Sequence, residues 1–381
     1  MTHRLLGAVV LWLSAAAAGA DPAFLAQASG LLDAGKADEA WALAQSVLTQ
    51  SPNDADALVV AGTSLLYQKM EPVDDESIFH PQADPAVESE YRLTPEGARS
   101  VAAYWKRVPG LDPQRSYLWG DLAELTFRAG DPSGALDYAR QLLALPGSDG
   151  LRVAALVFVL NLDWKDAIDA YSRMGSRAVL LYRGLTLWKD SQDGWREPLK
   201  AFASQPGPDA SGAGLAAYVA GPDMRDTETG YQEALKRETT AAGLLIRQKY
   251  VERYPNRFLA QLDFARALSE YGSFDKALGQ LALIDRQALA STDDERLTVQ
   301  FQRAWALQSL GRYDEADRVW QDLADTKEFY IRSAADWFVG KNAKRKGHLP
   351  DAKEAWAKIA GEPLRSKYAF WAARELKSLA P

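Results

Sequence analysis

The stretch QFQRAWALQSLGRYDEADRVWQDL, residues 300–323, contains the pattern that decides the fold of this 381-residue chain. A small residue, Ala304, is followed seven positions later by Gly311, and Ala316 follows five positions after that. Two antiparallel helices that cross closely need small residues at their contact, and Gly adopts the left-handed conformation that ends the first helix. The spacing therefore predicts one helix on each side of Gly311.

The same spacing recurs along the chain, which indicates a repeat architecture. The further copies are Ala28-Gly35-Ala40, Ala123-Gly130-Ala135, Ala265-Gly272-Ala277, Gly340-Gly347-Ala352 and a weaker copy, Ala155-Leu162-Ala167, with Leu at the turn. Acidic residues that follow the turn, such as Asp38 and Asp314, suit the positive end of the second helix. Alternating runs of β-branched residues are absent, so we predict an all-α fold without strands.

These residues resemble the tetratricopeptide repeat (TPR), whose small-Gly-Ala frame and terminating Pro they share, with Pro52 and Pro255 as examples. The resemblance implies an α-solenoid of antiparallel helix pairs, a TPR-like superhelix that is irregular in the middle. The last three copies start 39 and 36 residues apart, which is longer than the usual repeat of about 34 residues. The resemblance says little about function, because one fold hosts many functions.

Residues 1–20 read as a secretory signal peptide. Arg4 precedes an apolar run over 5–18, and the small residues Ala18-Gly19-Ala20 form a cleavage pattern. An uncleaved membrane anchor is the alternative, but the run is shorter than the roughly 20 residues that span a bilayer. No later apolar run reaches that length. We therefore expect a periplasmic protein of a bacterial envelope with no integral membrane segment after cleavage.

The rest of the chain divides into two helical halves in this interpretation. An N-terminal TPR-like half covers 21–203, a Gly/Pro-rich linker covers 204–230, and a C-terminal TPR-like half covers 231–381. A second break, 70–92, is rich in Asp, Glu and Pro and interrupts a repeat that starts near Leu58. We expect both breaks to be loops, with a lid, a hinge or a partner contact as alternatives.

Composition excludes several classes of function. The chain has no Cys, which removes disulfides, thiolate metal sites and cysteine nucleophiles. The formal net charge is −7, and without the signal peptide 43 basic residues stand against 51 acidic ones. This balance argues against nucleic acid as a partner. No phosphate-binding loop, zinc motif or serine-nucleophile motif occurs, so we expect no cofactor, no metal and no catalytic residue, and hence not an enzyme.

Two acidic stretches could be taken for a metal site or a catalytic site, but the sequence favours neither. Asp74, Asp75, Glu76, His80 and Asp84 offer metal donors, but their spacing matches no calcium loop. The run Asp293-Asp294-Glu295 precedes a predicted helix, so helix capping explains it better than glycoside hydrolysis.

The ending 368–374 is loosely similar to helices in the superhelical domain of soluble lytic transglycosylases. That likeness implies at most a noncatalytic role near the cell wall.

The first helix of each TPR-like pair lines the concave face, where partners bind. Counting from the frame places eight side chains there: Arg266, Phe301, Trp305, Gln308, Trp337, Lys341, Lys344 and Arg345. Aromatic and basic groups together suit a peptide with apolar anchors and an acidic group. The aromatics are equally well explained as core residues, and 341–346 as a solvated helix end.

We therefore expect a periplasmic scaffold or adaptor that binds protein or peptide partners, among them proteins of the cell envelope. The alternative is a noncatalytic peptidoglycan-binding protein or an accessory to cell-wall enzymes, since aromatic faces also stack on sugars. A third hypothesis, an unrecognised hydrolase, requires a buried carboxylate pair with perturbed proton affinity that faces a cleft.

Overall fold

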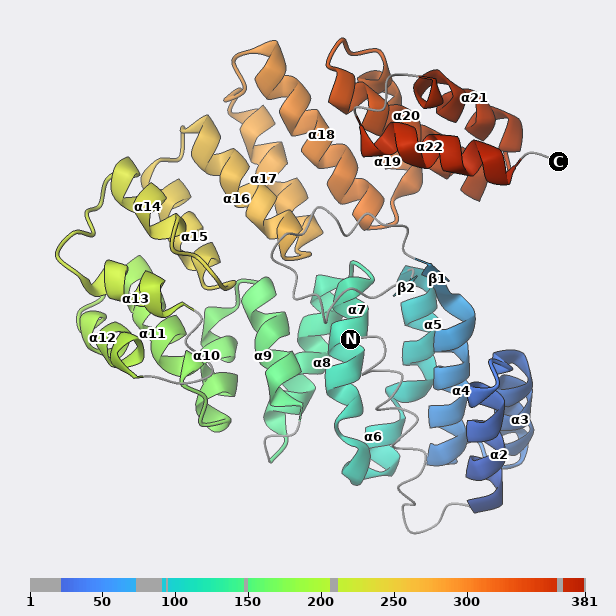
Figure 1. Cartoon of the computed structure of the whole chain (residues 1–381). Coiled ribbons are helices and arrows are strands. Elements are labelled where there is room, and N and C mark those ends of the chain that lie inside the picture. The colour runs from blue at the N-terminus through green and yellow to red at the C-terminus, as the bar shows by residue number, and fades with distance from the viewer. Residues whose placement is uncertain are drawn as a thin grey trace. The chain divides into compact units, whose positions relative to one another are not determined.

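The computed structural model describes residues 22–72, 91–93, 95–146, 150–205, 212–361 and 366–379. Within this part, helices follow one another along the chain and pack mainly against their sequence neighbours (Figure 1). The chain forms two compact units. The first contains residues up to Arg253 together with Glu270–Ser273, and the second contains Tyr254–Ser269 and the residues from Phe274 onward.

The first unit holds most of the helices. They are α2 (Pro22–Asp33), α3 (Ala37–Gln50), α4 (Ala55–Lys69), α5 (Pro95–Trp105), α6 (Val108–Leu111), α7 (Leu118–Arg128), α8 (Pro132–Ala144), α9 (Leu151–Leu160), α10 (Trp164–Arg173), α11 (Ala178–Lys189), α12 (Arg196–Ser204), α13 (Ala213–Ala220), α14 (Glu228–Leu235) and α15 (Gly243–Arg253), with a 3-10 turn, η3 (Pro113–Arg115). The second unit is built from α16 (Phe258–Glu270, whose last residue belongs to the first unit), α17 (Phe274–Arg286), α18 (Asp293–Ser309), α19 (Tyr313–Ala324), α20 (Phe329–Arg345), α21 (Leu349–Ala360) and α22 (Lys367–Ser378). The all-α prediction is confirmed.

The turn glycines of the frame adopt the predicted conformation. Gly35, Gly130, Gly272, Gly311 and Gly347 have φ values of 71°, 81°, 81°, 73° and 79°. At Gly311 the backbone N–H donates to the Gln308 carbonyl (3.1 Å), and the next N–H, of Arg312, donates to the Leu307 carbonyl (3.0 Å). This is the Schellman arrangement, which satisfies the last carbonyls of a helix. The frame therefore marks the ends of real helices.

The weak copy of the frame keeps the same turn without glycine. Leu162 has a φ of 60°, one of three non-glycine residues with positive φ in the described part of the chain. The frame alanines on either side, Ala155 and Ala167, are fully buried. The close helix contact therefore sets the turn at this position, although a left-handed leucine costs about 1–2 kcal/mol.

The helix contacts place a tryptophan against a glycine in both units. A Cβ atom on Gly340 would lie 2.3 Å from Nε1 of Trp356, and one on Gly62 would lie 2.3 Å from Cδ1 of Trp105. Both indoles are fully buried. Each indole N–H donates to a helix carbonyl at 3.2 Å, of Val59 for Trp105 and of Trp337 for Trp356. Glycine is needed at these two positions because the ring fills the space of a side chain.

The tryptophan–glycine contact shows where the acidic segment 70–92 lies within its repeat. Trp356 lies 16 positions after Gly340, whereas Trp105 lies 43 positions after Gly62. Most of the additional residues lie in the connection between α4 and α5, which has 25 residues against 3 between α20 and α21, and α4 and α5 still pack against each other as a pair. The break at 70–92 is therefore an insertion between the two helices of one repeat, as the interrupted frame suggested.

The expectation that the chain has no strands is wrong in one detail. Strands β1 (Met70–Pro72) and β2 (Tyr91–Leu93) form an antiparallel ribbon at the base of the insertion, with Met70 opposite Leu93. Three residues per strand are too few to produce a recognisable period-2 pattern, so the sequence carries no signal for them.

Helix α13 lies within the segment 204–230, which was assigned to a linker and expected to be a loop. It packs against α12 and α14. The compact units divide at Arg253 and not within that segment.

Candidate functional site

The eight predicted binding residues come from three first helices of the second unit, α16, α18 and α20. Arg266 is exposed on α16. On α18, Phe301 and Trp305 are half-buried, and their rings pack edge to face on Trp320 (5.5 Å) and Phe338 (5.7 Å). The inner rims of these rings therefore belong to the core, and the remaining ring surface is accessible.

Trp337 and Lys341 on α20 lie inside the unit. The Trp337 side chain is 2% exposed, and its ring packs at 5.7 Å on Trp356 and at 5.5 Å on Trp371. Lys341 is 8% exposed, and its Nζ lies 5.8 Å from the Trp337 ring centroid. In this conformation neither side chain is available to a partner, because α21 and α22 cover the face on which the frame places them.

The exposed basic residues at the end of α20 have partners in the same chain. Nζ of Lys344 lies 2.7 Å from the Glu375 carboxylate. The Arg345 guanidinium lies 4.2 Å above the ring of Tyr313. The neighbouring Lys346 pairs with Asp314 and Asp317 at 2.9 and 2.8 Å. The cationic surface is real, but its charge is partly neutralised within the molecule.

Gln308 belongs to a buried amide pair. Its side-chain amide donates to Asn342 Oδ1 at 3.0 Å, and the Asn342 amide donates back to Gln308 at 3.1 Å and to Asp317 at 3.2 Å. Gln308 is 2% exposed and Asn342 is fully buried. Buried polar groups are stable only when their hydrogen bonds are made, so this pair fixes α18 against α20.

Five of the eight predicted side chains therefore reach the surface: Arg266, Phe301, Trp305, Lys344 and Arg345. The other three, Gln308, Trp337 and Lys341, serve packing and hydrogen bonding inside the unit. The binding face remains a prediction, now restricted to those five residues.

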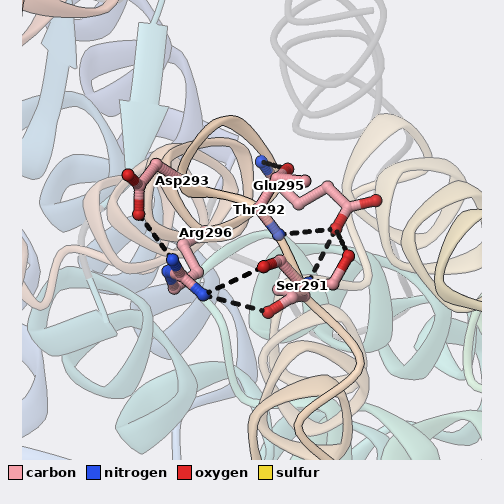
Figure 2. Close-up of polar contacts among 6 residues, drawn as sticks. Ser291, Thr292, Asp293, Glu295 and Arg296 are labelled. Carbon is pink, nitrogen blue, oxygen red and sulfur yellow. Dashed lines mark hydrogen bonds and ion pairs between the residues drawn. The ribbon is translucent and has the colours of Figure 1, made fainter.

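The acidic run Asp293–Glu295 forms the first turn of α18, and Glu295 takes part in the helix cap, as predicted (Figure 2). The backbone N–H of Glu295 donates to Oγ1 of Thr292 at 3.2 Å. In return, Glu295 Oε2 accepts from the backbone N–H of Thr292 at 3.1 Å and from Ser291 N–H at 2.7 Å. Hydrogen bonds from Ser291 and Thr292 lower the pKa of Glu295. This reciprocal capping box leaves Glu295 engaged with its own backbone.

The sequence analysis missed an acidic pair on α7. Asp121 and Glu124 lie three positions apart on this helix, Asp121 half-buried and Glu124 only 6% exposed. Burial raises the pKa of Asp121 to about 7, and the Glu124 carboxylate raises it as well. One helical turn earlier, burial raises the pKa of Tyr117 to about 12. In the sequence, the only sign of this pair is that two acidic residues lie three positions apart on the first helix of a repeat.

Asp121 has the perturbed proton affinity that the hydrolase hypothesis requires of a carboxylate pair. Burial in a protein interior favours a neutral carboxyl whether or not the group takes part in chemistry. The pair is therefore a candidate for substitution experiments and does not by itself define a catalytic site.

In the described ranges, no group of three or more His, Asp or Glu residues that could hold a metal ion occurs. No described helix combines the length and the apolar character that a membrane span needs. The acidic stretch Asp74–Asp84 and the predicted signal peptide, 1–20, lie outside the described residues.

No family model and no curated protein sequence matches the chain. Among solved structures, the chain is similar to the crystal structure of the P58(IPK) TPR domain, with 13% identity and a TM-score of 0.29, over 94% of this chain and 97% of that one. It is also similar to the crystal structure of yeast Tom70, with 11% identity and a TM-score of 0.32, over 93% and 88%. These scores are low, so the TPR-like character of the fold rests on the frame glycines and helix pairs described above.

Proposed function

We propose that this protein is a noncatalytic scaffold of the bacterial periplasm that binds a protein or peptide partner through the second unit. The observation that carries the proposal is the accessible ring surface of Trp305, on the same helix face as Phe301. Exposed Arg266 occupies the equivalent frame position on α16. An aromatic anchor and a cation on successive first helices suit a peptide that presents an apolar side chain and a carboxylate.

The periplasmic location is supported by the predicted signal peptide alone. Cleavage after Ala20 would release a chain that starts at Asp21, directly before α2. The location is tested by cell fractionation and by mass spectrometry of the mature N-terminus. An intact N-terminus in the cytoplasm would contradict it.

The partner is tested by photocrosslinking in cells, with a photoreactive amino acid at position 305. We expect a discrete protein adduct that is lost when Arg266→Glu is added. Position 349 on α21 is the control, because Leu349 is 43% exposed outside the proposed surface. The same adduct from both positions, or none from 305, would contradict the proposed surface.

The same experiment separates the alternatives. Capture of wall fragments from position 305 would favour the noncatalytic peptidoglycan-binding or wall-enzyme accessory protein. The noncatalytic reading is tested with Asp121→Asn and Glu124→Gln together. We expect this variant to keep its partner adduct and its cellular function, whereas an enzyme that uses the pair would lose the function and keep the adduct.

A further inference from the structure

Charge is unevenly distributed along the chain. Residues 329–381 carry 11 Lys and Arg against 5 Asp and Glu, whereas residues 1–328 carry 33 against 46. The helices α20–α22 are therefore basic, and the remainder of the chain is acidic. Such an asymmetry favours association between unlike parts of the molecule in different copies.

Helix α22 presents an unpartnered stripe to solvent. Tyr368 and Trp371 face the core at 1% and 6% exposure. Phe370, in contrast, is 57% exposed and has the most accessible aromatic ring among the described residues. Arg374 and Lys377, four and seven positions later, are also exposed and lie on the same side of the helix. The stripe joins one aromatic ring to two cations and contains no acid.

The first unit has a groove of the opposite character. It has a volume of about 490 Å³, opens to solvent, and is lined by Gly35, Lys36, Ala37, Asp38, Glu39, Tyr67 and Gln68. The carboxylate of Asp38 accepts from the Gln68 amide at 2.8 Å, which holds one acid at the groove wall. Burial and the nearby Asp33 carboxylate raise the pKa of Tyr67.

We propose that α22 of one copy docks into this groove of a second copy. Phe370 packs on Tyr67 and Ala37, and Arg374 and Lys377 pair with Asp38 and Glu39. Lys36, which lies 2.9 Å from Glu39 in the free groove, turns outward when the incoming cation replaces it. The two surfaces differ, so the contact is heterologous and each bound pair of copies leaves one stripe and one groove open.

The proposed contact is small and charged, so we expect association to be weak and to depend on the salt concentration. We expect a dissociation constant between about 1 µM and 1 mM, the range of weak interfaces. In light scattering, the apparent mass of the purified full chain should rise with concentration over this range in about 50 mM salt. It should return toward the monomer in about 0.5 M salt, where the Debye length falls to a few ångström.

Reciprocal charge reversal is the decisive experiment. The stripe variant, R374E with K377E, and the groove variant, D38K with E39K, should each remain monomeric. An equimolar mixture should associate again, because the unchanged stripe of the groove variant meets the unchanged groove of the stripe variant, and the two reversed surfaces are complementary as well. A chain with all four substitutions should also associate. Restoration by a second reversal is a result that misfolding cannot produce.

Matched controls test the geometry. K353E with K358E makes the same charge change on exposed positions of α21, and should leave association unchanged. Phe370→Ala should raise the dissociation constant at least about tenfold, and Leu349→Ala should not.

Wild-type protein that stays monomeric at 1 mM in low salt would overturn the proposal. So would association that persists in the stripe variant alone and in the groove variant alone. The scaffold function stands or falls separately, because its crosslink from position 305 lies on another helix.

Discussion

At the scale of single residues, backbone conformation explains more of this protein than side-chain chemistry does. Every complete copy of the frame has its turn glycine at positive φ, and the one copy with leucine adopts the same conformation at Leu162. The frame alanines are buried because they separate two helix backbones. A substitution is therefore judged first by the φ angle and then by the space around it.

Two glycines of the second unit allow a matched test of that argument. Gly347 has a φ of 79° and Gly279 lies within α17, and neither would bring a Cβ within 4 Å of another group. We expect Gly347→Ala to lower the free energy of unfolding by about 1–2 kcal/mol, because alanine is strained at positive φ. Gly279→Ala should raise it by up to about 1 kcal/mol through helix propensity. Urea unfolding measures both, and two shifts of the same sign would contradict the argument.

Asp121 makes the stability of the first unit depend on pH. Its folded-state pKa of about 7 lies above the ordinary value of 3.8 for Asp. The contribution of Asp121 to the free energy of unfolding should therefore be most favourable at acidic pH. It should decrease as the pH rises from about 4 to 7. Asp121→Asn should remove this slope and stabilise the protein at pH 8 by a few kcal/mol.

Thermal unfolding from pH 5 to pH 8 measures the effect of Asp121. The control is Asp169→Asn on the exposed side of α10, which should change the free energy of unfolding by less than about 0.5 kcal/mol at every pH. If the Asp121 variant kept the wild-type slope, burial at α7 would not be its origin.

At the scale of helices, the ends are satisfied by side chains from distant parts of the sequence. In the first unit, the ammonium group of Lys249 donates to the carbonyls of Trp188 (2.6 Å) and Lys189 (3.2 Å) at the end of α11. The guanidinium of Arg177 donates to the Phe202 carbonyl (2.8 Å) in the last turn of α12. Long cations thus do for helix C-termini what the capping box does for the N-terminus of α18.

The capping box predicts an asymmetry between two threonines of α18. Thr292→Ala should destabilise the second unit by about 1 kcal/mol, because the N-terminal amides lose their acceptor. Thr298→Ala, within the same helix, should be neutral or slightly stabilising, because alanine is the better helix former. Chemical unfolding of both variants measures the difference, and equal effects would mean that the cap contributes nothing.

The cap also gives α18 a pH dependence of opposite sign to that of Asp121. Hydrogen bonds from Ser291 and Thr292 lower the folded-state pKa of Glu295. Its stabilisation is therefore complete above the unfolded Glu pKa of about 4.3 and is lost as the pH falls through the lowered value. The difference between wild type and Glu295→Gln should vanish in that acidic window.

The amide pair between α18 and α20 predicts a non-additive pair of substitutions. Asn342→Leu alone should cost about 1–3 kcal/mol, because it leaves the buried amide of Gln308 without its partner. Adding Gln308→Leu should recover part of that loss, since no unsatisfied amide remains. A double-mutant cycle measures the coupling, and additive effects would show that the two amides do not depend on each other.

At the scale of the whole molecule, the sequence predicted helices and turns well and the exposure of the candidate binding residues less well. The frame is local, because Gly311 and Ala316 are constrained by residues within a few positions. Burial of Trp337 is not local, since it depends on Trp356 and Trp371, which lie on two later helices. Residues at equivalent positions of successive repeats look alike in the sequence. The sequence therefore does not show that α21 and α22 cover Trp337. The raised pKa of Asp121 has the same origin, because burial arises only after the helices pack.

The two tryptophan–glycine contacts predict how far a local loss of packing spreads. Trp356→Ala should remove about 3–5 kcal/mol from the second unit, because a buried ring is replaced by a cavity. Hydrogen exchange should then become faster in α18–α22, while α4–α7 retain their protection, because helices of a repeat protein rely on their neighbours. Trp105→Ala should give the reverse pattern. The wild-type rings occupy equivalent contacts, so each variant is the control for the other. Faster exchange throughout both units in either variant would mean that the chain unfolds as one cooperative body.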